Sequence, residues 1–136
     1  MRYLGLDLGS RTLGIATSDL TGTIATGKMV IRHNEEYDLL VAKVKELVET
    51  DKIGEIVLGL PKHMNNTIGE KALLSIEFEK MLKEAINIPV HLVDERLTTK
   101  MAENMLISNS IRREKRKKVI DSVAATIILQ SYLDKL

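Results

Sequence analysis

The sequence predicts a single α/β domain over residues 1–136, with a five-stranded mixed sheet and helices on both faces. Three strand-like segments open the chain and are separated only by short turns, which predicts that they are antiparallel neighbours. After residue 39 the apolar residues adopt helical spacing, and strand and helix then alternate. Strands joined through helices run parallel with right-handed crossovers, so two parallel strands should follow the three antiparallel ones.

The three opening strands are defined by alternation and by turn residues. Residues 2–8 place leucines on one face of the first strand, and residues 9–11 form a turn. Residues 14–18 form the second strand, and the turn at residues 19–22 has Asp and Gly in favoured positions. A third strand then ends at residues 28–32. The face of the first strand opposite the leucines carries Tyr3, Gly5 and Asp7.

The rest of the chain alternates between helix and strand. Residues 55–60 are mostly apolar and indicate a strand covered on both faces. A capping box at residues 67–70 opens a helix, and residues 90–94 form the fifth strand. One side of the helix after the capping box carries Leu74, Phe78, Met81, Leu82 and Ala85. The prediction is completed by a short helix near Thr98 or Thr99, a loop over residues 107–114 and a final helix over about 116–133.

Composition excludes several kinds of site and location. The chain has no cysteine, which excludes disulfides and thiolate metal sites. It shows neither the apolar run of a signal peptide nor the roughly 20 apolar residues of a membrane span, so we expect a cytoplasmic protein. Twenty basic and nineteen acidic side chains nearly cancel, so net charge indicates nothing about partners. With three tyrosines, one phenylalanine and no tryptophan, the chain is not expected to bind bases by stacking.

Three carboxylates stand out by their positions. Asp7 lies at the carboxyl end of the first strand, and Glu95 follows the end of the fifth. Ligands collect at these strand ends in parallel α/β sheets, so the two side chains should share one edge. Asp121 lies in the final helix, before an apolar stripe. Residues three and four positions apart share a helix face, which predicts that Asp121 lies on the packed side of the helix. The stripe consists of Ala124, Ala125 and Ile128, and its small residues allow the helix to approach the sheet closely.

A cluster of these carboxylates predicts a metal-dependent phosphodiesterase. Converging carboxylates repel one another, and a buried one is costly unless it is paired or binds a metal. Magnesium prefers oxygen ligands, and two such ions held by shared carboxylates activate water and stabilise a leaving oxygen on phosphorus. Structural roles compete with this interpretation. Asp7 would then be a turn residue, Glu95 would pair with Arg96 or cap a helix, and Asp121 would pair with the basic residues before it.

A basic run precedes Asp121, with six basic residues among the seven positions 112–118. Such a run suits a phosphodiester backbone, although a solvated surface is the commoner role. The macrodipole does not favour basic residues at a helix N-terminus, which argues for a functional reason. His63 follows the fourth strand and is a candidate general base or phosphate contact, although a surface role is the simpler interpretation. His33 carries no functional signal. His91 should contact a neighbouring helix. The candidate nucleic-acid contacts are Arg11, Lys62, Arg112, Arg113, Arg116 and Lys117.

Two resemblances to known proteins follow from these motifs. The first, Asp7-Leu8-Gly9-Ser10 with Gly14, resembles the first phosphate-binding loop of actin-like and sugar-kinase ATPases. Those proteins need two such subdomains, and this chain has room for one. The second resemblance, to the YqgF family, covers nearly the whole chain in family order. It is carried by LGLDLGSR at 4–11, GIATSD at 14–19, VLGLP at 57–61, DERLTT at 94–99, DSVAA at 121–125 and ILQSYL at 128–133.

The YqgF resemblance implies an RNase H-like fold and a bacterial cytoplasmic hydrolase. The implied activity is a nuclease that processes the 5′ end of the 16S rRNA precursor in ribosome biogenesis. An older label for the family is Holliday-junction resolvase. By match to the family motifs, Asp7, Glu95 and Asp121 carry over as an acidic triad that binds Mg²⁺ or Mn²⁺, with a two-metal site expected.

Two departures from related patterns bear on the substrate. The family often has Met-Asp/Asn-Gly-Thr after the fourth strand, where this chain has Asn66 in place of Gly. Asn tolerates the left-handed backbone nearly as well as Gly does, so this change is minor. True RuvC-type resolvases carry an acid at the end of the fourth strand and another three residues after the helical Asp. This chain has the Leu60-Pro61 region and Ala124 there, which favours a general nuclease over a junction resolvase.

Four hypotheses follow from the sequence, in order of preference. The first is a metal-dependent endonuclease that acts on structured RNA rather than DNA, as a monomer or a homodimer. The second is a Holliday-junction resolvase that uses the same residues as a dimer. The third is a non-catalytic RNA-binding or transcription-associated factor with a vestigial acidic cluster. The actin-like ATPase comes last. RNA against DNA, endo- against exonuclease action, and the choice of metal stay open at this stage.

Overall fold

The computed structural model describes the backbone of residues 1–60, 70–94 and 113–136, and the side chains of these except 70–71 and 113–122. Five strands form one sheet in the order β3-β2-β1-β4-β5. Neighbours β1–β2 and β2–β3 are antiparallel, whereas β1–β4 and β4–β5 are parallel. This confirms the predicted mixed sheet. The strands are β1 Arg2–Leu8, β2 Thr12–Ser18, β3 Ala25–Arg32, β4 Ile53–Leu60 and β5 Val90–Asp94.

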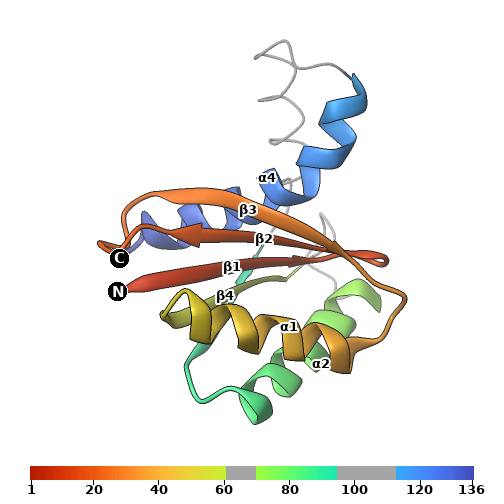
Figure 1. The fold of residues 1–136 in the computed structure, drawn as a ribbon, viewed down its shortest axis with the longest axis horizontal. Helices are drawn as coiled ribbons and strands as arrows, with labels where there is room; N and C mark the ends of the chain where they lie inside the picture. Colours follow the sequence, from red (N-terminus) through yellow and green to blue (C-terminus); the bar gives the residue numbers. More distant parts are fainter. Residues whose placement is uncertain (61–69, 95–112) are drawn as a thin grey trace.

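Helices cover both faces of the sheet, as Figure 1 shows. Helices α1 (Tyr37–Thr50) and α2 (Glu70–Ala85) lie on one face, and α4 (Arg113–Leu133) lies on the other. The alternation of β1 explains this division, because Leu4, Leu6 and Leu8 enter the core under α1 and α2. No helix in the described segments is long and apolar enough to cross a membrane.

The core under α4 is smaller than the core on the other face. It is formed by Ala125, Ile128 and Leu129 of the helix, together with Ala16 and Val57 of the sheet. The predicted apolar stripe on the final helix is therefore confirmed for the residues that follow Asp121. Ala124 and Ala125 are both buried, which fits a helix that approaches the sheet closely.

Several predicted boundaries were wrong by two or three residues. Strands β2 and β4 each begin two residues earlier than predicted, because Leu13 and Ile53 are buried and extend the ladder. Helix α4 begins at Arg113, so the predicted loop was wrong at its last two positions. Arg, Glu and Lys are good helix formers, and no Gly or Pro interrupts this run. The capping box at 67–70, the short helix near Thr98 and the loop positions 107–112 lie outside the described residues, apart from Glu70 at the start of α2.

The buried face of α2 also differs from the prediction. Leu74 and Ala85 were expected on the packed side, but both are exposed, Leu74 by 42%. The buried stripe is rotated away from them, because small residues in the first turns pack against the sheet where larger ones were expected. The buried residues are Ala72, Ser75, Phe78 and Leu82, with Ile86 just beyond the helix.

Candidate active site

Asp7 is the penultimate residue of β1, at the carboxyl end of a central strand. Its side chain is half-buried and lies on the face covered by α4, because the leucines on either side of it enter the opposite core. The turn after β1 is closed by the backbone N–H of Gly9, which donates to Thr12 O at 2.8 Å. Asp7 therefore stands at the junction of a rigid strand and a tight turn.

Helix α4 runs antiparallel to β1 and crosses it at Gly5. At one end the rings of Tyr3 and Tyr132 lie 5.9 Å apart. Farther along, a Cβ atom placed on Gly5 would lie 2.7 Å from Leu129 Cβ and 3.0 Å from the carbonyl oxygen of Ala125. Only glycine permits this approach. In Figure 1, the C-terminal part of α4 runs along the sheet from the start of β1, and its N-terminal turns rise away from the sheet.

The backbone of Asp121 lies one helical turn before Ala125, on the Asp7 side of the crossing. Four residues of helix correspond to about 6 Å along its axis. Asp7 lies two residues beyond Gly5, which is about 7 Å along an extended strand. The side chain of Asp121 is outside the described part of the chain.

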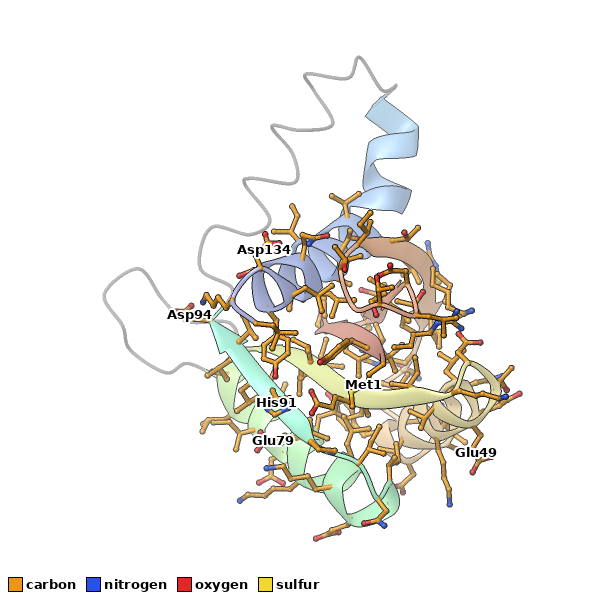
Figure 2. All side chains as sticks on the ribbon, turned by 90° about the vertical axis from the view of Figure 1, so that its left-hand side faces the viewer. Met1, Glu49, Glu79, His91, Asp94 and Asp134 are labelled. Atoms are coloured by element: carbon orange, nitrogen blue, oxygen red, sulfur yellow. The ribbon has the colours of Figure 1, made fainter. Side chains whose placement is uncertain are left out.

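The end of β5 lies at the same edge of the sheet as the end of β1. Leu58 of β4 pairs with Leu6 of β1, and Leu60 pairs with Asp94, the last residue of β5. Figure 2 shows Asp94 at the tip of β5, with His91 farther back on the same strand. Glu95 follows Asp94 in the sequence and lies outside the described residues.

Alternate residues of β5 face α4. The ring of His91 stacks on Tyr132 at 5.2 Å, and Val93 packs against the core under α4. This confirms that His91 contacts a helix. Its Nε2 lies 3.4 Å from a carboxylate oxygen of Glu55 but lacks the alignment of a hydrogen bond. Burial raises the pKa of Tyr132, and the negative charge of Glu55 raises it further.

Arg11 is held in place by the linker between β3 and α1. One of its guanidinium N–H groups donates to the side-chain oxygen of Asn34, and its carbonyl accepts from the backbone N–H of His33 at 2.9 Å. The same loop receives the His33 ring, whose Nε2 lies 3.0 Å from Gly9 O. The sequence did not identify Asn34 and His33 as contributors to this loop. The available signal was the predicted antiparallel pairing of the second and third strands. In the structure Thr12 pairs with Arg32, which places the residues after Arg32 beside the turn.

The predicted site residues fall into three groups. The side chains of Asp7 and Arg11 are described. The second group occupies helical positions of α4 whose side chains are not described, namely Asp121, Arg113, Arg116 and Lys117. The third group lies outside the described residues and comprises Lys62, His63, Glu95 and Arg112. Among described residues, no three His, Cys, Asp or Glu side chains form a metal-binding group. The triad therefore stays a prediction.

Comparison with known proteins places the chain in a family. A profile of the RuvX family, described as "Holliday junction resolvase", matches residues 1–135. The chain belongs to the RuvX family. A Bacillus subtilis relative named "Putative pre-16S rRNA nuclease" is 52% identical over 100% of this chain and 99% of its own length. A relative of the same name from Latilactobacillus sakei is also 52% identical, over 98% of this chain and 93% of its own length. The YqgF resemblance is therefore confirmed.

Solved structures place this RuvX chain in the RNase H-like fold. Thermus thermophilus RuvC in complex with a Holliday junction substrate has a TM-score of 0.63 and 14% identity, covering 99% of this chain and 94% of RuvC. The yeast mitochondrial Holliday junction resolvase has a TM-score of 0.52 and 16% identity, covering 96% and 77%.

A further solved structure accounts for the ATPase-like loop. A ROK hexokinase from Thermus thermophilus has a TM-score of 0.51 and 22% identity, covering 76% of this chain but 38% of the hexokinase. At this identity the likeness is one of fold alone. The resemblance of the glycine loop after β1 to the ATPase loop therefore fits a shared arrangement of strands.

Proposed function

We propose that this protein is a divalent-metal-dependent endonuclease that processes the precursor of 16S rRNA, with Asp7, Glu95 and Asp121 as its acidic triad. The names of its half-identical relatives support the reaction and the substrate. The observation that carries the site is the crossing of α4 over β1 at Gly5. Measured from that crossing, Asp121 lies about 6 Å along α4 and Asp7 lies about 7 Å along β1, in the same direction.

The position proposed for Glu95 follows from the alternation of β5. His91 and Val93 face α4, so one more residue of alternation would put Glu95 on the same face as Asp7, and Asp94 on the other. Strands β1 and β5 are separated by β4, so their backbones lie roughly 10 Å apart. A gap of that size would leave room for divalent ions held by a carboxylate from each side.

The donor set fits a hard cation, since all three residues supply carboxylate oxygens and the chain has no cysteine. When bound, Mg²⁺ or Mn²⁺ would activate water and stabilise the leaving oxygen. Asp7 and Asp121 would hold the ions from a rigid strand and a packed helix. Glu95 would complete the metal site or accept a hydrogen bond from the attacking water and orient it.

The basic residues would bind the phosphate backbone. Arg113, Arg116 and Lys117 occupy the first turns of α4, directly before Asp121, and Arg11 lies in the turn after Asp7. Lys62 and Arg112 complete the proposed contact set. Phosphate contacts of this kind supply salt-dependent affinity without sequence preference. We place this reaction in the cytoplasm, carried out by residues 1–136 as one domain.

Junction resolution is the second candidate function, because the family description names it. It requires a homodimer that makes paired nicks. Ala124 is buried against the core at the position where RuvC-type resolvases were expected to carry a second helical acid. The alanine at this position favours a general nuclease over a junction resolvase.

The test compares cleavage of a 5′-extended 16S precursor with cleavage of a four-way DNA junction, with and without Mg²⁺. We expect Mg²⁺-dependent cleavage of the RNA, and losses on the order of 100-fold in Asp7→Asn and Glu95→Gln. Asp94→Asn is the matched control, at the same edge but on the other face, and should keep wild-type activity. Wild-type activity in Asp7→Asn would refute the triad. Binding without cleavage under any metal would favour the non-catalytic factor, and paired nicking by a dimer would favour the resolvase.

A further inference from the structure

The linker between β3 and α1 is bound to the turn that follows Asp7. The backbone N–H of His33 donates to Arg11 O at 2.9 Å, and the Arg11 side chain donates to Asn34 Oδ1. The ring of His33 reaches the two ends of the same turn, with Nε2 at 3.0 Å from Gly9 O and 3.2 Å from Thr12 O. Backbone and side chains of one short segment therefore hold the whole turn.

These contacts select one tautomer of the His33 ring. The backbone N–H of Glu35 donates to Nδ1 at 3.0 Å, so Nδ1 carries no proton. Both neighbours of Nε2 are carbonyl oxygens, which accept hydrogen bonds and do not donate, so Nε2 carries the proton. The opposite tautomer would set a lone pair against two oxygens.

The linker adopts an unfavourable backbone conformation to make these contacts. Glu35 has φ of 62°, in the left-handed region that non-glycine residues rarely occupy. The hydrogen bond from its N–H to the His33 ring fastens this conformation, and Tyr37 packs its ring 5.8 Å from that of His33. Such backbone strain persists where surrounding contacts fix it, and it is concentrated at functional sites.

We propose that His33 is a positioning residue, which in its neutral Nε2–H form fixes the turn after β1 so that Arg11 is held ready for a substrate phosphate beside Asp7. This inference rests on the proposed function for its substrate, a structured RNA. It adds to that function a residue without direct contact to substrate. Its two ring nitrogens have separate roles: Nε2 holds the turn, and Nδ1 holds the linker.

Two substitutions separate the roles of the ring nitrogens. In His33→Gln the side-chain amide nitrogen reaches the position of Nε2 and still donates to the turn. In His33→Asn the shorter side chain keeps an acceptor near Nδ1 but does not reach Gly9 or Thr12. We expect His33→Gln to behave like the wild type toward RNA, and His33→Asn to behave like Arg11→Ala.

The measurement is the affinity for a structured RNA as a function of salt concentration, without metal, so that it does not depend on cleavage. Removing one phosphate contact lowers the slope of log affinity against log salt by about one. Arg11→Ala and His33→Asn should each show this loss, and the double variant should show it only once. A change that merely destabilises the fold would not alter the slope, and thermal unfolding of each variant verifies that it is folded.

An independent readout is the ¹⁵N spectrum of the His33 imidazole in the full-length chain. We expect a protonated Nε2 and an unprotonated Nδ1. Protonation at Nδ1, equal salt slopes for wild type and His33→Asn, or additive losses in the double variant would each overturn the proposal. Failure of the nuclease function is recognised separately, as RNA binding with these slopes but without cleavage of the precursor.

Discussion

The contact between Gly5 and α4 allows a sharp test of how the site is assembled. Gly5→Ala adds one methyl group where α4 crosses β1, 2.7 Å from Leu129 Cβ and 3.0 Å from Ala125 O. Nonbonded carbon atoms rest about 3.5 to 4.0 Å apart, so the helix must move away by roughly 1 Å. The obstacle includes backbone, so a side-chain rotation alone does not relieve the clash.

Two effects of different size follow from this movement. Overpacking of a core typically costs about 1 to 3 kcal/mol, which is less than the roughly 5 to 15 kcal/mol by which domains are stable. The variant should therefore stay folded at 25 °C, with a melting temperature lower by several degrees. Asp121 moves with the helix, however, and a 1 Å displacement of a catalytic group costs on the order of 100-fold in rate. Activity should thus fall far more than stability.

The assay is precursor cleavage at 25 °C beside thermal unfolding, with Gly54→Ala as the matched control. A Cβ atom on Gly54 would lie 2.6 Å from Met1 Cγ, which is an equally short contact. Met1 is 63% exposed and lies at the other end of the sheet, so its side chain can rotate aside. The control should keep wild-type activity. If folded Gly5→Ala cleaves within about threefold of the wild-type rate, the crossing does not set the spacing of the acids.

Three further predictions concern stability and charge. Asp19 accepts hydrogen bonds from one hydroxyl and two backbone N–H groups, which hold its pKa below the usual range. Its stabilisation is present above about pH 4 and is lost as pH falls through the lowered pKa, so calorimetry should find the melting temperatures of wild type and Asp19→Ala converging in acid. Gln130 bonds Thr23 O and the N–H of Ala25, each at 2.9 Å. At about 1 kcal/mol per bond, Gln130→Ala should lower the free energy of unfolding in urea by about 1 to 2 kcal/mol, and an unchanged midpoint would contradict this. Arg116→Ala should weaken RNA binding and reduce the salt slope by about one without lowering the melting temperature.

The sheet was predictable because its local and global signals agree. The alternation in β1, the short turns and the apolar run of β4 each indicate the same topology, and the order β3-β2-β1-β4-β5 confirms it. Strand starts were less predictable. Leu13 and Ile53 extend their strands through burial and pairing with other strands, and neither is visible as a local pattern. The start of α4 was predicted three residues too late, because residues 107–114 were interpreted as a loop.

Parts of the candidate site could be predicted where the spacing of apolar residues follows the period of a helix or a strand. The stripe after Asp121 indicated that α4 packs closely, and the burial of Ala124 and Ala125 agrees. That Gly5 is the point of closest approach depends on how a helix and a strand cross, which no sequence period encodes. His33 was dismissed for a similar reason. Its ring binds a turn more than twenty residues earlier, and only the pairing of β2 with β3 brings the two together.

The described side-chain contacts of α4 lie in its C-terminal half, whereas the proposed functional residues occupy its N-terminal half. Gln130 bonds the start of β3, Tyr132 stacks on His91, and Leu129 packs on Gly5. Asp121 and the basic positions before it precede this anchored half in the same helix. The sequence can therefore place basic side chains at a helix N-terminus, where the macrodipole opposes them, because packing elsewhere along the same helix stabilises it. A phosphate backbone bound there would remove the unfavourable interaction, so the helix has a physical reason to bind an anion at the end that carries the proposed catalytic acid.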